Sequence, residues 1–362
     1  MVAQSDSTQS KLIFASDFRL RIEQDWNSRK SDGSFRDNRT RLRYRFRAGL
    51  NYQLNHWASF GASIRTGNPN KQQDPQLTLG DGFKEFGTLP IGLEKIYFQA
   101  EHKGFVFWGG KNTFPFQKNN ELFWSDNVYP EGIFIKKGFD FQSTLINQLD
   151  IRGGHFIIAD RGSSLNIDSY LQALQISAKF FNNNISIFPS FYQFKNIPNI
   201  PDGGDTFLFN YSIFHIGTKV KLSNQPLLNF ELDYYLNIED YTNNDSIPST
   251  LKNQKNGFIA GLSMGKLKRK GDWIIKATYS YLQQYAAVDF MAQNDWARWD
   301  YSSYQSPDGR LTNFKGFEIV GGYMIEDKLS LKAKYYLIDQ LISYGSFKET
   351  GSRIRFDIDI KF

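Results

Sequence analysis

The chain has 362 residues, of which 40% are hydrophobic, and it contains 33 Phe, 19 Tyr, 7 Trp and no Cys. The absence of cysteine excludes disulfides, cysteine-based zinc sites and thiol catalysis, and the four histidines are isolated in sequence, so we expect neither a metal nor a cofactor. The net charge of +6 would suit a nucleic-acid binder, but only if the charge lies on an accessible face.

Length and hydropathy also limit the fold class. No uncharged apolar run approaches the roughly 18 residues that a transmembrane helix needs. The aromatic fraction of 16% is nevertheless high for a chain with a mean hydropathy of −0.48. Outer-membrane β-barrels combine these properties, because they show lipid an apolar band with aromatic girdles and enclose a polar interior.

The N-terminal end is polar. Its first ten residues lack the apolar segment of a signal peptide. We therefore expect the mature form of an exported chain, with a polar tail over residues 1–11 and a single barrel domain over residues 12–362.

The clearest strand lies between Asp37 and Leu54. Its odd positions carry five arginines, Arg39, Arg41, Arg43, Arg45 and Arg47. The even positions from Leu42 onward are apolar or aromatic. Since successive side chains of a strand point to opposite faces, one face is an arginine ladder and the other is apolar. A helix would spread these arginines around its circumference.

The same alternation recurs along the chain and predicts about sixteen strands. They begin near residues 14, 38, 57, 93, 104, 132, 149, 169, 184, 206, 227, 256, 272, 314, 328 and 352. The connections between them are alternately short and long, which is typical of periplasmic turns and extracellular loops. The sequence thus predicts an all-β fold, a transmembrane antiparallel β-barrel of sixteen strands. The competing fold, a soluble double sandwich, gives no reason for this sorting of the loops.

A barrel of this size has room for a water-filled lumen lined by the polar faces. Closure would place the last strand beside the first and gather the inward cations on four neighbouring strands. These cations are Arg19, Arg21, Arg39, Arg41, Arg43, Arg45, Arg47, Arg65, Arg353, Arg355 and Lys361. Fewer acids share this wall, and arginine stays charged at any working pH, so we expect a net positive wall that favours anions. The alternative is that the arginines only hydrate the wall and pair with neighbouring acids.

The connection over residues 112–131 is expected to be the third external loop. It contains Phe114, Phe116, Phe123, Trp124 and Tyr129, which is too aromatic for a segment that moves freely in water. Folded into the lumen, it would narrow the pore. Its acids would then oppose the basic wall, which makes Glu121, Asp126 and Glu131 candidate constriction residues. An ordinary packed surface loop is the alternative.

Other functions have weak support. The loop from Gln284 to Asn313 carries Trp296, Trp299, Tyr301 and Tyr304, which could stack on sugars but are equally typical of an interfacial belt. There is no Gly-x-Ser-x-Gly or His-Glu-x-x-His motif, so we do not expect an enzyme. Nucleic-acid binding is not expected either, because the arginines would lie inside a closed wall. Phe362 ends an alternating strand, as in barrels recognised by the bacterial barrel assembly machinery.

Several segments of the N-terminal third resemble the porin family of Bacteroidetes. This family is of the outer-membrane general-porin type and is distantly similar to the phosphate-selective, arginine-lined porins. The resemblance is strongest over residues 14–135. It is carried by Asp17-Phe18-Arg19-Leu20-Arg21, Asp37-Asn38-Arg39 through Leu50, Ser63-Ile64-Arg65-Thr66-Gly67-Asn68, Gly110-Lys111-Asn112, Glu121-Leu122-Phe123-Trp124 and Pro130-Glu131-Gly132.

The resemblance implies a porin in the bacterial outer membrane that passes small hydrophilic solutes by diffusion and often forms a trimer. Its expected partners are outer-membrane lipid and lipopolysaccharide, the barrel assembly machinery, and small anionic or neutral solutes. The anion preference rests on the arginine ladder, not on the resemblance. The competing hypothesis is a plugged barrel that acts as a subunit or anchor of a larger outer-membrane secretion or uptake complex.

Overall fold

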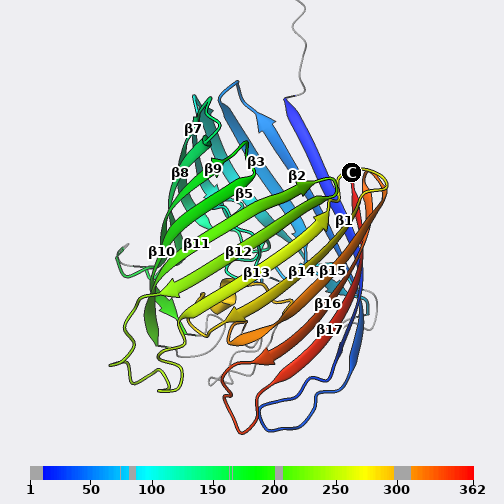
Figure 1. Cartoon of the computed structure of the whole chain (residues 1–362), viewed down its shortest axis with the longest axis vertical. Coiled ribbons are helices and arrows are strands. Elements are labelled where there is room, and N and C mark those ends of the chain that lie inside the picture. Colours follow the sequence, from blue (N-terminus) through cyan, green and yellow to red (C-terminus); the bar gives the residue numbers. More distant parts are fainter. Residues whose placement is uncertain are drawn as a thin grey trace, which may run out of the picture.

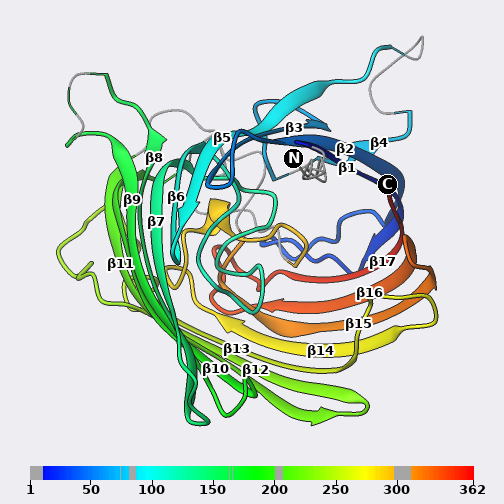
Figure 2. The same cartoon turned by 90° about the horizontal axis from the view of Figure 1, so that it is seen from above.

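The computed structural model describes residues 11–73, 75–80, 87–162, 164, 166–199, 207–296 and 311–362. Within these ranges, seventeen strands form one antiparallel sheet. The last strand pairs with the first over a register that runs from Asp17–Lys361 to Trp26–Ser352, so the sheet closes into a barrel (Figures 1 and 2). No helix in the described part of the chain is long and apolar enough to cross a bilayer.

Sixteen of the described strands make up the barrel wall, which confirms the predicted fold. Every predicted strand start lies within three residues of an observed one. The wall strands are β1 (Leu12–Trp26), β2 (Arg39–Gln53), β3 (Ala58–Thr66), β5 (Ile91–His102), β6 (Phe105–Lys111), β7 (Glu131–Asp140), β8 (Ile146–Ala159), β9 (Ser169–Phe180), β10 (Ile185–Pro198), β11 (Leu208–Asn224), β12 (Leu227–Asn237), β13 (Asn256–Gly265), β14 (Trp273–Leu282), β15 (Phe314–Glu326), β16 (Leu329–Gln340) and β17 (Thr350–Lys361).

The remaining strand, β4 (Leu77–Thr78), was not predicted. It lies in the connection between β3 and β5 and pairs with Arg43 and Tyr44 of β2. The nine-residue β3 pairs only with the part of β2 from Arg47 onward, so the rest of that edge of the longer β2 needs another partner. β4 takes up part of this edge, whose backbone N–H and C=O groups would otherwise stay unpaired.

The connections between wall strands alternate in length. The short ones span residues 54–57, 103–104, 141–145, 181–184, 225–226, 266–272 and 327–328. The long ones span 27–38, 67–90, 112–130, 160–168, 199–207, 238–255, 283–313 and 341–349. In Figure 1 the start of β1 and the C-terminus lie at the end of the barrel opposite the long connections 27–38, 238–255 and 341–349.

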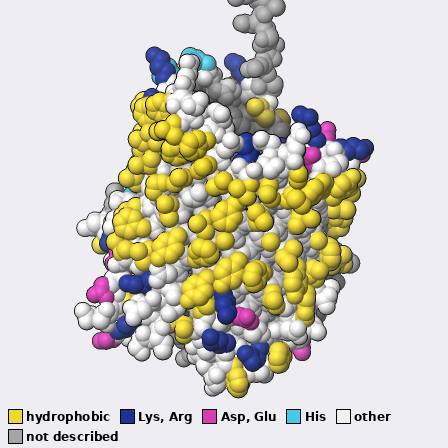
Figure 3. All heavy atoms as spheres, in the orientation of Figure 1, with side chains coloured by type: hydrophobic (Ala, Val, Ile, Leu, Met, Phe, Trp, Pro, Cys, Tyr) yellow, Lys and Arg dark blue, Asp and Glu magenta, His cyan; other side chains and the backbone are white. Residues whose placement is uncertain are grey.

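The outer surface of the barrel is apolar. Hydrophobic side chains form a continuous band over the face shown in Figure 3, with charged side chains above and below it. The alternation along β17 is the cause: Phe356 is 50% exposed on the outside, whereas its neighbours Arg355 and Asp357 are each 2% exposed. The predicted assignment of apolar faces outward and charged faces inward is therefore realised.

A large cluster of buried hydrophobic side chains lies inside the barrel. It joins inward aromatic residues of the wall to residues of three long connections, those over 112–130, 238–255 and 283–313. Figure 2 shows parts of the connections over 112–130 and 283–313 within the ring of strands. The lumen is consequently divided into an apolar, filled part and a charged part.

Candidate functional site

The charged part of the lumen is bordered by β1, β2 and β17, which are neighbours in the barrel. The register sets Arg19 opposite Arg45, and Arg21 opposite Arg43. On the other side of β1, Arg21 lies opposite Asp357. Cross-strand neighbours of this kind lie about 5 Å apart at Cβ, so each arginine of the ladder has cations and acids beside it.

Two arginines of β1 are neutralised by β17. Arg19 Nε lies 2.5 Å from Asp359 Oδ1. Arg21 binds Asp357 in a bidentate manner, with its Nε and Nη2 at 2.6 and 2.8 Å from the two carboxylate oxygens. Bidentate guanidinium–carboxylate pairs are strong and fix geometry. Arg45 is also paired, with Asp17. Part of the ladder is therefore balanced by acids, as in the alternative reading of the sequence.

Glu23 is shared among several guanidiniums. This side chain of β1 is 1% exposed and forms an ion pair with Arg41. Arg355 Nε lies 3.1 Å from its Oε2, and Arg43 Nη1 lies 3.6 Å from its Oε1. One carboxylate thus faces three cations, and the wall keeps a local excess of positive charge at this level.

A β-bulge brings an unpredicted acid into the lumen. The register between β3 and β5 shifts between Ser63 and Ile64, which leaves Glu94 without a directly opposed residue. Bulges re-aim side chains, and Glu94 is 3% exposed, with its Oε1 at 2.9 Å from Arg47 Nη2 and 3.8 Å from Arg65 Nε. The period-two pattern does not reveal such a shift.

These arginines border a cavity of about 640 Å³. Eight of the eleven predicted pore cations line it: Arg19, Arg21, Arg41, Arg43, Arg45, Arg47, Arg353 and Arg355. Four lysines that were not among the predicted pore cations also line the cavity: Lys118, Lys276, Lys332 and Lys334. Among the described residues, these twelve lining cations face four lining acids, which are Glu121, Asp126, Asp295 and Glu318.

The other predicted residues lie away from this cavity. The Arg39 side chain is 47% exposed and pairs with Asp25 at 2.7 Å. Arg65 donates to backbone carbonyls of residues 66, 68 and 71, and so holds the second long connection. Glu131 begins β7, and Lys361 ends β17. Phe362 follows and is 64% exposed.

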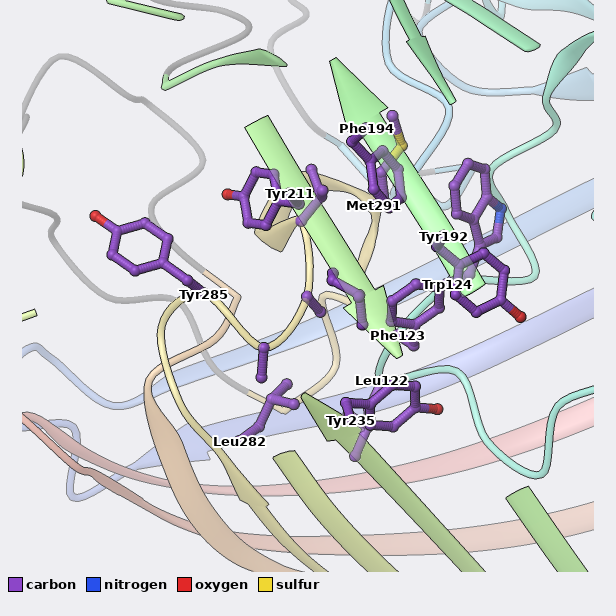
Figure 4. Packing of buried hydrophobic residues seen from close by; sticks show 14 of the residues in the cluster. Leu122, Phe123, Trp124, Tyr192, Phe194, Tyr211, Tyr235, Leu282, Tyr285 and Met291 are labelled. Carbon is purple, nitrogen blue, oxygen red and sulfur yellow. The ribbon is translucent and has the colours of Figure 1, made fainter. Parts of the chain in front are cut away.

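Aromatic packing fixes the third long connection inside the barrel. Phe123 stacks on Tyr235 of β12 with ring centroids 5.0 Å apart and contacts Tyr192 of β10 at 4.7 Å (Figure 4). Phe114 stacks on Trp124 at 4.4 Å. Burial of such a side chain contributes about 1.5–3 kcal/mol. The segment therefore cannot leave the wall without exposing several aromatic rings.

A buried polar group adds a second attachment. Asp233 of β12 accepts hydrogen bonds from the side-chain amides of Asn119 and Asn120 at 3.1 and 2.8 Å, and His215 Nε2 lies 2.9 Å from its other oxygen. Ser190 Oγ lies 3.4 Å from His215 Nδ1, so the trio resembles a catalytic triad. However, Tyr235 stacks on the imidazole with ring centroids 4.4 Å apart. The hydrogen bonds from Asn119 and Asn120 to Asp233 attach the third connection to the wall. We interpret the trio as structural.

The seventh long connection contributes a second inward segment. It includes a short 3₁₀-helix, η1 (Asp289–Met291). Its backbone joins the third connection, because Ser125 N–H donates to Met291 O at 2.8 Å and Gln293 N–H donates to Glu121 O at 3.0 Å. Trp296 is 6% exposed and belongs to the apolar cluster, whereas Trp299, Tyr301 and Tyr304 lie outside the described residues.

Two of the cavity acids have shifted pKa values. Burial and the neighbouring Asp126 carboxylate raise the pKa of Glu121, against the opposing charges of Lys118 and Lys334. Burial alone would raise the pKa of Asp295, but the charges of Arg355 and Arg21 hold it well below its usual range. Among the described residues, no group of three or more His, Asp and Glu side chains is placed to bind a metal ion.

Comparison with known proteins agrees with this geometry. Residues 30–208 match a protein family described as "Putative porin". The structure of OprB from Pseudomonas putida is similar, with a TM-score of 0.59 and 12% identity over 97% of this chain and 94% of that chain. OmpF from Salmonella typhi gives a TM-score of 0.56 and 10% identity over 97% of each chain.

A third structure is the trimer form of OmpT, an outer membrane protein of Vibrio cholerae. Its TM-score is 0.53, with 11% identity over 97% of this chain and 99% of that chain. At these identities the likeness is one of fold. No curated protein matches the sequence. The chain thus has the fold of a porin barrel, and about half of it matches a porin family.

Proposed function

We propose that the protein is an outer-membrane porin, a passive diffusion channel for small hydrophilic solutes that favours anions. The observation that carries the proposal is the cavity inside a closed barrel, bordered by twelve Arg or Lys side chains and four acids among the described residues. The match of residues 30–208 to a porin family and the apolar outer band support the same function.

The mechanism is electrostatic. Guanidinium and ammonium groups replace part of the hydration shell of a passing anion, and their spread over several strands keeps each contact weak enough for release. Glu23, Asp357 and Asp359 pair with arginines of the wall and lower its net charge. The proposed site comprises the eight predicted arginines that line the cavity together with Lys118, Lys276, Lys332 and Lys334.

The segment over residues 112–131 acts as the constriction loop in this proposal. Its aromatic residues occupy one side of the lumen, and its acids Glu121 and Asp126 line the cavity together with the arginines. Oppositely charged groups on two sides of a pore orient polar solutes as they pass. Glu131, the first residue of β7, is the third proposed acid of the constriction and lies at the end of this segment.

We place the protein in the outer membrane of a bacterium, as a porin of the type that residues 14–135 resemble in Bacteroidetes and, more distantly, in phosphate-selective porins. The apolar band would contact lipid and lipopolysaccharide, and the barrel assembly machinery would bind the last strand with Phe362. A homotrimer is the proposed assembly. It has a precedent in the trimer form of OmpT, which shares the fold.

A liposome-swelling assay tests the channel. Purified, folded protein is incorporated into liposomes, and swelling is recorded in isotonic solutions of neutral sugars of increasing size. We expect rapid swelling with the smallest sugars and a fall in rate with size. Absence of swelling with protein whose folding is verified by heat-modifiable gel mobility would contradict the porin. It would favour the plugged barrel that serves a larger secretion or uptake complex.

A further inference from the structure

A carboxylate of the seventh long connection lies on the arginine wall. Asp295 forms an ion pair with Arg355 of β17. Its other oxygen accepts from Gln293 Nε2 at 3.2 Å and from the Tyr336 hydroxyl of β16 at 3.4 Å. Both Asp295 and Arg355 border the cavity. The wall therefore holds a carboxylate with a guanidinium, an amide and a phenol.

The backbone around this carboxylate is held by the same strand. Arg353 Nη1 donates to Asp295 O at 2.7 Å and to Asn294 O at 3.4 Å. Two consecutive inward arginines of β17 thus bind a single turn of the seventh connection. Asp295 therefore contacts the wall although it belongs to a connection and not to a strand of the barrel.

Arg355 lies between two carboxylates of different origin. Glu23, on one side, belongs to β1 and is fixed by the barrel ladder. Asp295, on the other side, belongs to a connection and can be replaced without breaking strand pairing. Arg355 itself is 2% exposed and is paired with both carboxylates, so a solute carboxylate that binds its guanidinium has to displace one of them, and Asp295 is the one that belongs to a connection.

We propose that Arg355 and Tyr336 form a carboxylate-binding subsite in which Asp295 is an internal ligand, and that small carboxylate solutes compete with Asp295 for it. This inference rests on the proposed function and names a substrate class for it, small organic acids. It also makes Asp295 a selectivity residue, because its charge neutralises a guanidinium that would otherwise bind passing anions.

The test uses the full-length protein in planar bilayers under a potassium chloride gradient. Asp295→Asn keeps the size of the side chain and removes its charge. We expect the ratio of chloride to potassium permeability to rise by about twofold or more, because the Arg355 guanidinium is then no longer neutralised by residue 295. Asp272→Asn is the matched control. It changes the net charge equally, but it lies in a short turn, where it accepts the backbone N–H groups of Lys268 and Arg269 at 2.9 and 3.0 Å.

A binding measurement separates the subsite from the channel. Saturation-transfer NMR is recorded on Asp295→Ala in detergent micelles with potassium acetate as the probe. We expect transfer to acetate that is lost when Arg355→Gln is added and is weaker in the wild type. Absence of transfer in Asp295→Ala, or an unchanged permeability ratio in Asp295→Asn, would overturn the subsite. Absence of any conductance in the wild type would instead contradict the proposed porin.

Discussion

Glu23 is the single residue that holds three arginines of the basic wall together. Its carboxylate is buried and faces Arg41, Arg43 and Arg355. Removal of one partner from a buried charge cluster leaves uncompensated charges, which costs about 3–5 kcal/mol when the cluster is dry. Because this cluster borders a hydrated cavity, we expect the lower end of that range.

The corresponding variant is Glu23→Gln. We expect the free energy of unfolding to fall by about 3 kcal/mol, as measured by guanidinium chloride unfolding in detergent with tryptophan fluorescence. Asp245→Asn serves as a control on an exposed turn, where changes are usually within about 0.5 kcal/mol. Equal stability of Glu23→Gln and the wild type would show that Glu23 does not organise the arginines.

The ladder itself is tested by charge reversal. Arg43 and Arg45 are adjacent inward residues of β2, and both line the cavity. Arg43→Glu combined with Arg45→Glu should cut the anion preference without unfolding the barrel, because fixed charge of the opposite sign now borders the pore. Lys268→Glu combined with Arg269→Glu gives the same change in net charge in the short connection over 266–272 and should leave selectivity unchanged. An unchanged reversal potential in the ladder variant would refute the role of the arginines.

The acid of the constriction loop predicts a pH dependence. Burial and the adjacent Asp126 raise the pKa of Glu121, so this group becomes neutral at a higher pH than an ordinary glutamate. As the pH falls through that pKa, the loop loses negative charge and the anion preference should increase. Because the pKa of Glu121 is higher in the folded protein than in the unfolded chain, the free energy of unfolding should also rise as the pH falls through that pKa.

The measurement is the reversal potential of the wild type and Glu121→Gln between pH 7.5 and pH 4.5, a window of about three units above the usual glutamate pKa. We expect a shift toward chloride selectivity at low pH in the wild type and a smaller shift in the variant. Equal shifts in both proteins would assign the titration to another group.

At the scale of elements, the third long connection is held by its rings. Phe123 contacts Tyr235 and Tyr192, and both Phe123 and Trp124 are buried. Phe123→Ala combined with Trp124→Ala removes packing worth about 3–5 kcal/mol per ring. Because the loop then detaches from the wall, we expect larger and noisier single-channel currents.

The control for this loop variant is Phe317→Ala. Phe317 lies on β15 and is 51% exposed on the outer surface. It should leave the channel current unchanged. Quiet currents of wild-type size in the Phe123 and Trp124 variant would contradict a role of these rings in holding the loop.

The strands could be predicted from the sequence because a period of two repeats regardless of tertiary contacts. The acid pairing of the ladder could not, since it depends on register: a bulge at Glu94 and closure between β1 and β17 decide which carboxylate faces which arginine. The position of Asp295 on the arginine wall was not predicted either. The aromatic residues after it favoured an interfacial belt over a sugar-binding site, whereas the packing of Trp296 and the contacts of Asp295 with β17 show that the segment turns inward.

On the scale of the whole molecule, the barrel carries an apolar band outside and a divided lumen inside. A porin of this kind is proposed to work as a trimer. We expect native mass spectrometry from detergent to give three copies, and single insertions to close in three equal current steps. A monomer mass together with single-step closure would contradict the trimer and leave the pore itself intact.

In this proposal the folded barrel forms an open pore whose basic wall favours anions. The most direct test is the zero-current potential of the wild-type protein in a planar bilayer under a tenfold gradient of potassium chloride, recorded after stable conductance steps appear. Twelve cations and four acids line the cavity in the described part of the chain. They predict a zero-current potential shifted from zero toward the equilibrium potential of chloride. A shift toward the equilibrium potential of potassium would show that the pore favours cations and would contradict the proposed role of the basic wall.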